Sequence, residues 1–306
     1  MYILLALMLD WLVGDPPNRW HPVAWIGRAV SRVEHYAPRG KTWRFLYGLG
    51  LAVGGSASVD MAVGMLAHLP KAVRHPTEVL TLKLSIGAHG LDVAAAEVEA
   101  ALKSGELDRA RWLVGWHLVS RDTSYLSAEE VAGATVESLS ENLTDGLVAP
   151  VFFYAIGGAP AAWVYRFVNT CDSMLGYRDE EHEWLGKAPA KLDDFLNLVP
   201  ARLAGGIIVL AAAVLGLDSK NAWHTMISQH GRTESPNAGW TMSAAAGAFG
   251  ITLSKRGQYM LKGGNGIADA KTINNARRLL RLAFFIGAVC CAILEIFVRK
   301  LRVREG

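Results

Sequence analysis

The chain is poor in charged residues and in cysteine. Charged residues make up 19% of its 306 residues, compared with about 25% in ordinary soluble domains. The 31 basic and 28 acidic residues leave a net charge of +3, which argues against a nucleic-acid partner. The three cysteines include the adjacent Cys290 and Cys291 inside an apolar run, so they cannot form a disulfide framework.

Motifs of well-known nucleotide and metal sites are also missing. The sequence contains no Gly-x-x-x-x-Gly-Lys-Ser/Thr phosphate loop, no His-Glu-x-x-His, no Cys-x-x-Cys and no Gly-x-Ser-x-Gly. The segment Lys262–Gly266 is rich in glycine, but its residue order differs from that of a phosphate loop. A nucleotide bound by this chain would therefore bind in a non-standard way.

Apolar residues, in contrast, are abundant and gather in runs. They make up 51% of the chain, and the mean hydropathy is +0.21. A membrane-spanning helix needs roughly 20 apolar residues. We therefore predict spans at Phe45–Leu69, Leu147–Tyr165, Leu282–Val298 and, if it is extended, Leu203–Leu217.

Two further apolar segments could span the membrane or lie at its surface. Met1–Val13 lacks the basic start and the cleavage site of a signal peptide. Ser235–Ser254 is built largely of Ala, Gly and Ser, which suits a close-packed or re-entrant helix. With no alternating strand pattern of useful length, the sequence predicts an all-α, multi-pass membrane protein. It would form one domain over residues 1–306, with about four to six membrane-embedded helices.

The connecting segments show helical signals but little asymmetry of charge. Apolar residues recur with helical spacing from Leu91 to Leu102, and Ser127 with Glu130 forms a capping-box pattern that predicts a helix starting near Ala128. Lys and Arg are spread almost evenly over the loops. Only the basic tail RKLRVR indicates on which side of the membrane a segment lies. It predicts that the protein is in the cell membrane with its C-terminal end in the cytoplasm.

The predicted capped helix carries three carboxylates on one face. Glu137, Glu141 and Asp145 are four residues apart, so they lie within about 80° of one another around an α-helix. Like charges at this spacing destabilise a helix by roughly 0.2–0.5 kcal/mol per pair. A bound hard cation such as Mg²⁺ would offset that repulsion. A solvated acidic face explains the pattern equally well, although the neighbouring Asn142 and Thr144 favour a site slightly.

Other polar segments could contribute to the same chemistry or be only surface loops. Arg121 and Asp122 stand just before the helix cap, and Ser235–Trp240 forms a turn-rich hexapeptide. His21, in the segment Asp10–Pro22, could act as a general base, but a histidine before proline is more often structural. The segment Asn169–Arg202 offers possible metal ligands and phosphate partners, namely Asp172, Asp179, Asp193 and Asp194, and Arg178, Lys187, Lys191 and Arg202.

Six motifs follow one another along the chain: GDPPNRWHPVAWIGR, SRDTS, ESLSENLTDGLVAP, NTCDSMLGYRDE, KLDDFLNLVPARL and SPNAGWTMSAAAGA. Together, and in this order, they resemble the adenosylcobinamide-phosphate synthase family of cobalamin biosynthesis, the CobD/CbiB type. The resemblance runs from about Leu9 to at least Gly250. Ser120 stands where the family usually has Gly, and Cys171 where it usually has Leu.

The resemblance implies a membrane enzyme that joins adenosylcobyric acid to aminopropanol phosphate as an amide, with ATP as co-substrate and Mg²⁺ as cofactor. Such a reaction needs an activated carboxylate, most simply an acyl phosphate, together with a metal ion, cations and a positioned amine. We therefore predict catalytic roles for Asp122, Glu137 and Lys191, and phosphate contacts from Arg121, Lys191, Arg178 and Arg202. We also predict Mg²⁺ bound by Glu141, Asp145 and Asp172. Asn237 and Trp240, with the small residues from Ala244 to Gly250, are a candidate corrinoid wall, but helix–helix packing in lipid explains the small residues equally well.

Two other function classes stay open. A membrane corrinoid carrier or transporter would bind substrate without ATP chemistry and would use the intramembrane Asp60 and Glu295 as coupling residues. A non-catalytic scaffold would tolerate alanine at Glu137, Glu141 and Asp172. Besides the lipid bilayer, partners can include a second copy of the chain or later membrane enzymes of the pathway.

Strict alternation of single spans would put consecutive motif loops on opposite sides of the membrane, where they could not share one site. Either one run is a re-entrant hairpin or lies outside the bilayer, or the site lies within the helix bundle and its ionisable residues face a water-filled cavity. We expect the exception at Phe45–Leu69, which contains Gly54, Gly55 and Asp60.

Overall fold

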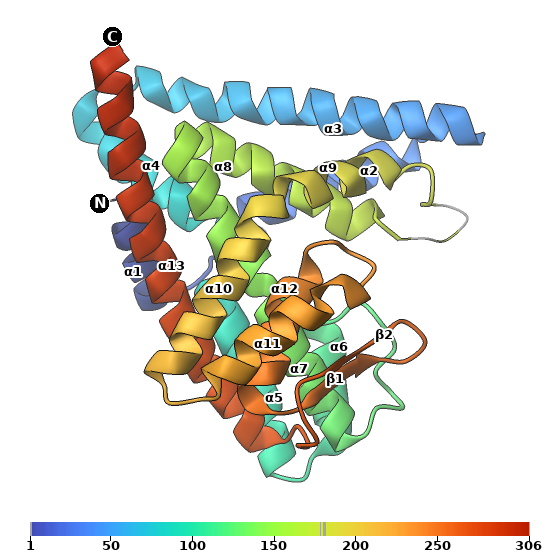
Figure 1. Ribbon diagram of the computed structural model, residues 1–306. Coiled ribbons are helices and arrows are strands. Elements are labelled where there is room, and N and C mark those ends of the chain that lie inside the picture. Colours follow the sequence, from blue (N-terminus) through green and yellow to red (C-terminus); the bar gives the residue numbers. More distant parts are fainter. Residues whose placement is uncertain (1, 178, 180–181, 306) are drawn as a thin grey trace. The chain divides into compact units, whose positions relative to one another are not determined.

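The computed structural model describes residues 2–177, 179 and 182–305, except for the side chains of 299 and 302–305 (Figure 1). The described chain is helical apart from loops and one antiparallel hairpin, β1 (Thr252–Lys255) and β2 (Tyr259–Lys262). The all-α prediction is therefore confirmed. The hairpin was not predicted, because strands of four residues are too short to show a clear alternation.

Four segments of the described chain are long and apolar enough to cross a membrane: Lys41–His68, Lys71–Lys103, Ala128–Leu175 and Ala270–Val298. A bent pair of helices, Lys187–Leu196 and Leu198–Val214, would make a fifth. These segments contain or overlap the four predicted runs and support a multi-pass membrane protein. Lys71–Lys103 was missed because charged residues interrupt its apolar sequence.

For Phe45–Leu69 the prediction of a re-entrant hairpin is wrong, whereas the alternative that the segment lies outside the bilayer stays a prediction. The segment forms one continuous helix, α3 (Lys41–Gly64), followed by the 3-10 turn η1 (Met65–His68). Two of its glycines, Gly48 and Gly55, serve packing rather than a turn. A Cβ atom on Gly55 would lie 2.1 Å from Cζ of Phe167. A Cβ atom on Gly48 would lie 1.9 Å from the carbonyl oxygen of Leu185.

The small-residue run Ser235–Ser254 also differs from a spanning helix. Only Ala238–Phe249 is helical (α12, 12 residues), and the helix ends at Gly250 with a φ of 63°. Roughly 20 residues are needed to cross the hydrocarbon core, so α12 is too short to do so. After Gly250 the chain turns into the hairpin, whose tight connection uses Gly257 at a φ of 73°.

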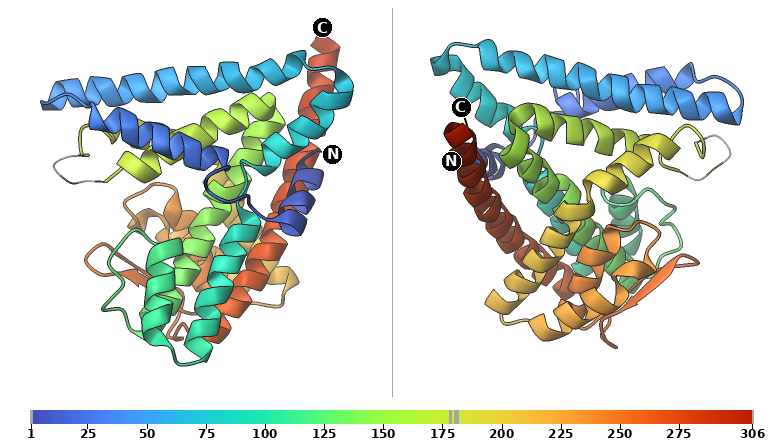
Figure 2. Two further views of the ribbon diagram at one scale, coloured as in Figure 1. Left: turned by 180° about the vertical axis from the view of Figure 1, so that it is seen from behind. Right: turned by 45° about the horizontal axis from the view of Figure 1, so that its top comes forward.

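The chain divides into two compact units. Unit 1 comprises Met1–Gly87, Ala149–Asn197 and Ala288–Gly306. Its helices are α1 (Tyr2–Val13), α2 (Pro22–His35), α3, η1, α4 (Lys71–Lys83), α8 (Ala149–Leu175), α9 (Lys187–Leu196) and the last part of α13 (Ala270–Glu305). Within this unit α3 lies alongside α8 and α9 (Figures 1 and 2).

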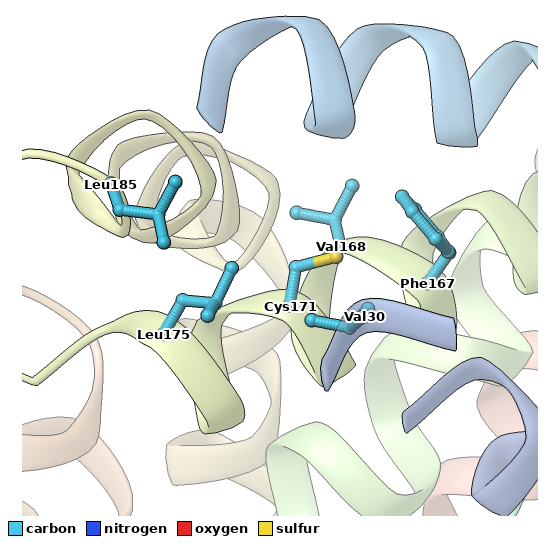
Figure 3. Packing of buried hydrophobic residues seen from close by; sticks show 6 residues of the cluster. All are labelled: Val30, Phe167, Val168, Cys171, Leu175 and Leu185. Atoms are coloured by element: carbon cyan, nitrogen blue, oxygen red, sulfur yellow. The ribbon is translucent and has the colours of Figure 1, made fainter. Parts of the chain in front are cut away.

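The core of unit 1 forms where α8 meets α2 and the segment before α9. Side chains from one face of α8 pack against Val30 and Leu185 (Figure 3). Close packing of α3 on this core requires glycine at the positions described above. The N-terminal motif is tied down nearby, because Nζ of the buried Lys83 lies 2.7 Å from Oδ1 of Asp15 and 2.6 Å from the carbonyl oxygen of Gly14.

His21 has a structural role in this motif. It is the N-cap of α2, and its Nδ1 accepts a hydrogen bond from the backbone N–H of Val23 at 3.2 Å. Its Nε2 lies 3.6 Å from Asp15. Burial acts to raise the pKa of Asp15, but hydrogen bonds from His21 and Lys83 outweigh it and lower that pKa. Asp15 is therefore an anion that holds the loop between α1 and α2.

A second histidine of unit 1 is held between two carboxylates. His182 places Nδ1 2.7 Å from Asp179 and Nε2 2.8 Å from Glu34. Partial burial acts to lower the pKa of His182, but hydrogen bonds to Asp179 and Glu34 outweigh it and raise that pKa above its ordinary 6.5. The folded chain therefore binds this proton more tightly than the unfolded chain does.

A raised pKa gives a pH dependence of definite sign. The stabilisation is complete below the ordinary pKa and is lost as the pH rises through the raised value. Between about pH 6 and about pH 8, we expect the wild type to lose more thermal stability than His182→Asn. Melting curves of both proteins in one detergent measure this, with the exposed His35→Asn as control. Equal losses in the wild type and His182→Asn would contradict the prediction.

Unit 2 comprises Ala88–Val148 and Leu198–Gly287. It contains α5 (Ala88–Lys103), α6 (Leu107–His117), α7 (Ala128–Leu143), the π-turn η2 (Thr144–Val148), α10 (Leu198–Val214), α11 (Ser219–Gln229), η3 (His230–Arg232), α12, the hairpin and the first part of α13. Helices α5, α6 and α7 lie side by side (Figure 2). The α7 start is as predicted, because the Ser127–Glu130 capping box is formed.

A cluster of charges joins α5 to α13 inside unit 2. Arg277 bridges Asp92 at 3.0 Å and Glu99 at 2.7 Å, and Arg281 bridges Asp92 at 2.7 Å. Both carboxylates are buried. The two guanidinium groups therefore neutralise two carboxylates that are largely buried.

Candidate functional site

The acidic face of α7 begins with a buried carboxylate. Glu137 is 7% exposed, whereas Glu141, one turn later, is exposed. The α-helix continues through both residues and ends at Leu143. Asp145 follows in the π-turn η2, where the spacing of 100° per residue no longer applies. Of the three carboxylates predicted on one face, Glu137 and Glu141 therefore lie on the α-helix. Asp145 lies in the π-turn that follows it.

Glu137 faces the predicted phosphate residue Arg121. Nη2 of Arg121 lies 3.8 Å from Oε1 of Glu137, and both side chains are largely buried. Within the described part of the chain, Oε2 of Glu137 and Nε of Arg121 are buried without a hydrogen-bond partner. Buried polar atoms without partners are costly, and they are characteristic of sites that bind a ligand.

The hairpin brings two residues to this pair that sequence reasoning missed. Tyr259 and Lys255 lie within electrostatic reach of Glu137, and the Tyr259 hydroxyl donates to Sδ of Met242 on α12 at 3.8 Å. Burial, followed by the negative charges of Glu137 and Glu141, raises the pKa of Tyr259 far above its ordinary value. Its phenol therefore stays protonated. In the sequence, the only sign of this hairpin was Gly257, a turn residue between two short segments of mixed polar and apolar residues.

Asp122 shapes the loop that carries Arg121. Its Oδ1 accepts a hydrogen bond from the backbone N–H of Ser124 at 2.9 Å, and this bond lowers the pKa of Asp122. The side chain is exposed. Asp122 is therefore an anion at the edge of the Arg121–Glu137 pair, and its catalytic role stays a prediction.

Arg202 meets two predicted residues of a distant segment, Asn237 and Trp240, in a second group of unit 2. The guanidinium carbon of Arg202 lies 4.8 Å from the ring centroid of Trp240, and Nη1 of Arg202 lies 3.5 Å from Oδ1 of Asn237. The ring of His230 contacts Trp240 at 4.0 Å between centroids. Nε1 of Trp240 is buried without a hydrogen-bond partner among the described residues. The group thus combines a cation, an amide and an indole donor.

The small residues that follow are used for packing within the protein. Ala244, Ala245, Ala246 and Gly247 are all buried. A Cβ atom on Gly247 would lie 2.5 Å from the carbonyl oxygen of Asn221 on α11, and one on Gly263 would lie 2.0 Å from that of Ala246. This favours helix packing over a corrinoid wall for these residues. The assignment of Asn237 and Trp240 to a corrinoid stays a prediction.

The remaining predicted site residues belong to unit 1. Asp172 lies on α8, where its Oδ1 would be 2.3 Å from a Cβ atom on Gly176. Lys191, on α9, has a side chain 76% exposed, with Nζ 3.9 Å from Oδ2 of Asp194. Arg178 lies outside the described residues. The roles of all three stay predictions.

Mg²⁺ prefers oxygen ligands, and the sequence predicted them on the acidic face that begins with Glu137. Among the described residues, no three His, Cys, Asp or Glu side chains form a group that could hold a metal ion. Mg²⁺ is usually bound by only one or two carboxylates, together with substrate phosphates and waters. The binding of Mg²⁺ by Glu141, Asp145 and Asp172 stays a prediction.

Comparison with known proteins assigns the chain to a family. A model of the CobD/Cbib protein family matches residues 3–283. The chain belongs to the CobD/CbiB family of cobalamin biosynthesis proteins. The match extends beyond Gly250, so it includes the hairpin and the start of α13, where the resemblance of the sequence motifs was weaker.

Individual members of the CobD/CbiB family align over nearly the whole chain. A probable cobalamin biosynthesis protein CobD of Methanothermobacter thermautotrophicus is 36% identical, over 95% of this chain and 96% of its own length. CobD of Dehalococcoides mccartyi is 39% identical over 85% and 86%, and CbiB of Salmonella typhimurium is 34% identical over 95% and 94%. No solved structure matches the chain.

Proposed function

We propose that this CobD/CbiB family member is an adenosylcobinamide-phosphate synthase, which forms an amide between adenosylcobyric acid and aminopropanol phosphate with ATP and Mg²⁺. The observation that carries the proposal is the buried Glu137, whose Oε2 has no hydrogen-bond partner among the described residues while Oε1 faces Arg121. A group of this kind can accept a proton or hold a ligand in a site that excludes water.

The proposed reaction has two transfers. A carboxylate oxygen of adenosylcobyric acid attacks the γ-phosphorus of ATP, the bond from that phosphorus to the β–γ bridging oxygen breaks, and ADP leaves. The amine of aminopropanol phosphate, having lost one proton from its ammonium form, then attacks the acyl carbon. The carbon–nitrogen bond forms, the bond to phosphate breaks, and the nitrogen loses a second proton.

The side chains of unit 2 suit particular parts of this sequence. Glu137 would accept a proton from the amine, because its Oε2 has no hydrogen-bond partner among the described residues. Arg121 would contact phosphate oxygens, and the protonated Tyr259 would donate a hydrogen bond to an oxygen that gains charge. Mg²⁺ bound by Glu141 and Asp145 would neutralise phosphoryl charge. Arg202, Asn237 and Trp240 could hold amide groups of the corrinoid.

Product analysis separates this proposal from a carrier function. The full-length protein in nanodiscs is incubated with adenosylcobyric acid, aminopropanol phosphate, ATP and Mg²⁺, and the products are measured by mass spectrometry. We expect adenosylcobinamide phosphate, ADP and phosphate in equal amounts. Corrinoid binding without ATP consumption would instead identify a membrane corrinoid carrier.

The metal assignment predicts a specific effect of Glu141→Gln. This change keeps the size of the side chain and removes the charge, so a magnesium–nucleotide complex should bind less tightly. We expect the Mg²⁺ concentration that gives half-maximal turnover to rise about tenfold, corresponding to about 1.4 kcal/mol. Glu129→Gln, in the exposed first turn of the same helix, serves as control. An unchanged Mg²⁺ dependence would remove Glu141 from the metal site.

A further inference from the structure

Unit 1 contains a cavity whose lining residues have no role in the reaction proposed above. It has a volume of about 410 Å³ and is lined by α3, η1, α4, α8, the last part of α13 and Tyr2 of α1. Small-molecule sites in proteins are typically about 300–1,000 Å³ in volume. The cavity is therefore large enough for a small organic ligand.

A break in a long apolar helix lies at this cavity. Within α8, Gly158 has a φ of 73° and a ψ of −165°, and Pro160 follows two residues later. Both residues line the cavity. Non-helical backbone at membrane depth is tolerated where it is buried in protein or lines a water-filled cavity, and discontinuous helices of this kind mark ligand sites in membrane transporters.

Carboxylates face the same cavity. Glu295 of α13 is 4% exposed, although it lies in one of the segments apolar enough to span a membrane. Glu78 of α4 accepts a hydrogen bond from the hydroxyl of the buried Tyr154 at 2.8 Å. Ionisable residues at such positions are costly, and they generally serve binding or transport. The two carboxylates suit a ligand that carries a primary ammonium group.

Donors for an anion line the cavity as well. Arg74 and His75 of α4 face it, and His75 is in hydrogen-bond contact with the hydroxyl of Tyr2. Within the described chain, the Arg74 guanidinium makes no hydrogen bond or ion pair. The Arg74 guanidinium, which can form two parallel hydrogen bonds, and the donor that remains on the Tyr2–His75 pair suit the oxygens of a phosphate.

The cation and the carboxylate on α4 are spaced for a short ligand. Arg74 and Glu78 are four residues apart, so their Cβ atoms lie about 5–6 Å from each other along one face. We propose that this cavity binds a primary ammonium joined to a phosphate by a short chain, with Glu78 and Glu295 at the ammonium and Arg74, His75 and Tyr2 at the phosphate.

Two sources carry this chemistry: a free amino-alcohol phosphate and the headgroup of phosphatidylethanolamine. The free form includes the aminopropanol phosphate of the proposed function. For that source the inference rests on the proposed function, and the cavity is a binding site distinct from the one at Glu137 where the amine reacts. Binding is measured without ATP or corrinoid, so a failure to bind here leaves the synthase assay unaffected. A failure of the synthase assay equally leaves the binding measurement valid.

Calorimetry on the full-length protein in phosphatidylglycerol nanodiscs tests the free source, with aminopropanol phosphate as titrant. We expect saturable binding that Glu295→Gln, Glu78→Gln and Arg74→Gln each weaken at least tenfold. Asp60→Asn on α3 and Lys71→Gln on α4 are matched controls, because both residues lie outside the cavity lining, and they should bind as the wild type does. Tyr154→Phe keeps the core volume and should weaken binding by removing the hydrogen bond to Glu78.

Mass spectrometry of the purified protein tests the lipid source. If the headgroup is the ligand, the wild type retains phosphatidylethanolamine over phosphatidylglycerol, and Glu295→Gln and Arg74→Gln lose this preference. Binding of either source with this dependence on the cavity residues supports the proposal. The proposal is overturned if neither binds, or if aminopropanol without phosphate or γ-aminobutyrate binds as tightly as the phosphate ester.

Discussion

Glu137→Gln is expected to lower the rate of amide formation by about 10²- to 10⁴-fold, the usual contribution of a general base. Glutamine keeps the size of the side chain and can still contact Arg121, but it cannot accept a proton. The affinity for the corrinoid should change little, since the effect is on proton transfer rather than on binding. The measurement is single-turnover formation of the amide product at saturating substrates.

A matched control for this change exists on the same helix. Glu129 lies in the first turn of α7 and is exposed, so Glu129→Gln tests the effect of removing one charge from α7. If Glu137→Gln and Glu129→Gln both turn over at the wild-type rate, Glu137 is not the base. Tyr259→Phe gives a second test, because loss of the hydroxyl should slow the same step while the core volume is kept.

Arg277→Met is expected to have the largest effect on stability. It removes the partner that Asp92 and Glu99 share and leaves buried carboxylates without full compensation. Breaking a buried ion pair in this way costs about 3–5 kcal/mol. Because Arg281 still contacts Asp92, and Lys103 contacts Glu99, the loss should lie near the lower end of that range.

Arg278→Met provides the comparison for this loss. Arg278 is the next residue of α13 and is exposed, so its replacement should change the free energy of unfolding by less than about 0.5 kcal/mol. Denaturant unfolding in one detergent, followed by circular dichroism, measures both variants. Equal stability of the two would show that the Asp92–Glu99–Arg277 cluster contributes nothing net.

Local signals predicted the helices well, because they depend on residues close together in the chain. Ser127 and Glu130 form the predicted capping box, and α7 begins at Ala128. The runs around Leu147 and Leu282 lie in long apolar helices for the same reason. The glycines of α3 were misinterpreted, since Gly55 is required by Phe167, more than a hundred residues away.

The types of residue in the candidate site could be predicted from the sequence, but the contacts between them could not. Glu137 and Glu141 have the same helical spacing, yet Glu137 is buried beside Arg121 whereas Glu141 is exposed, and no local pattern shows this. Tyr259 was missed because its role depends on where a short hairpin lies. Arg202, Asn237 and Trp240 were each identified from local sequence, whereas their meeting is a property of the tertiary fold.

The interleaving of the two units along the chain has a consequence for biosynthesis. Unit 2 needs residues up to Gly287, and unit 1 needs the segment that starts at Ala288. Neither unit can therefore be finished on the ribosome before α13 has been made. A domain whose chain is synthesised early can fold while translation continues, but here Glu78 meets its cavity partner Glu295, and Asp92 meets Arg277, only after nearly the whole chain has left the exit tunnel. Nascent chains that stall before α13 would expose both incomplete cores to the quality-control proteases of the membrane.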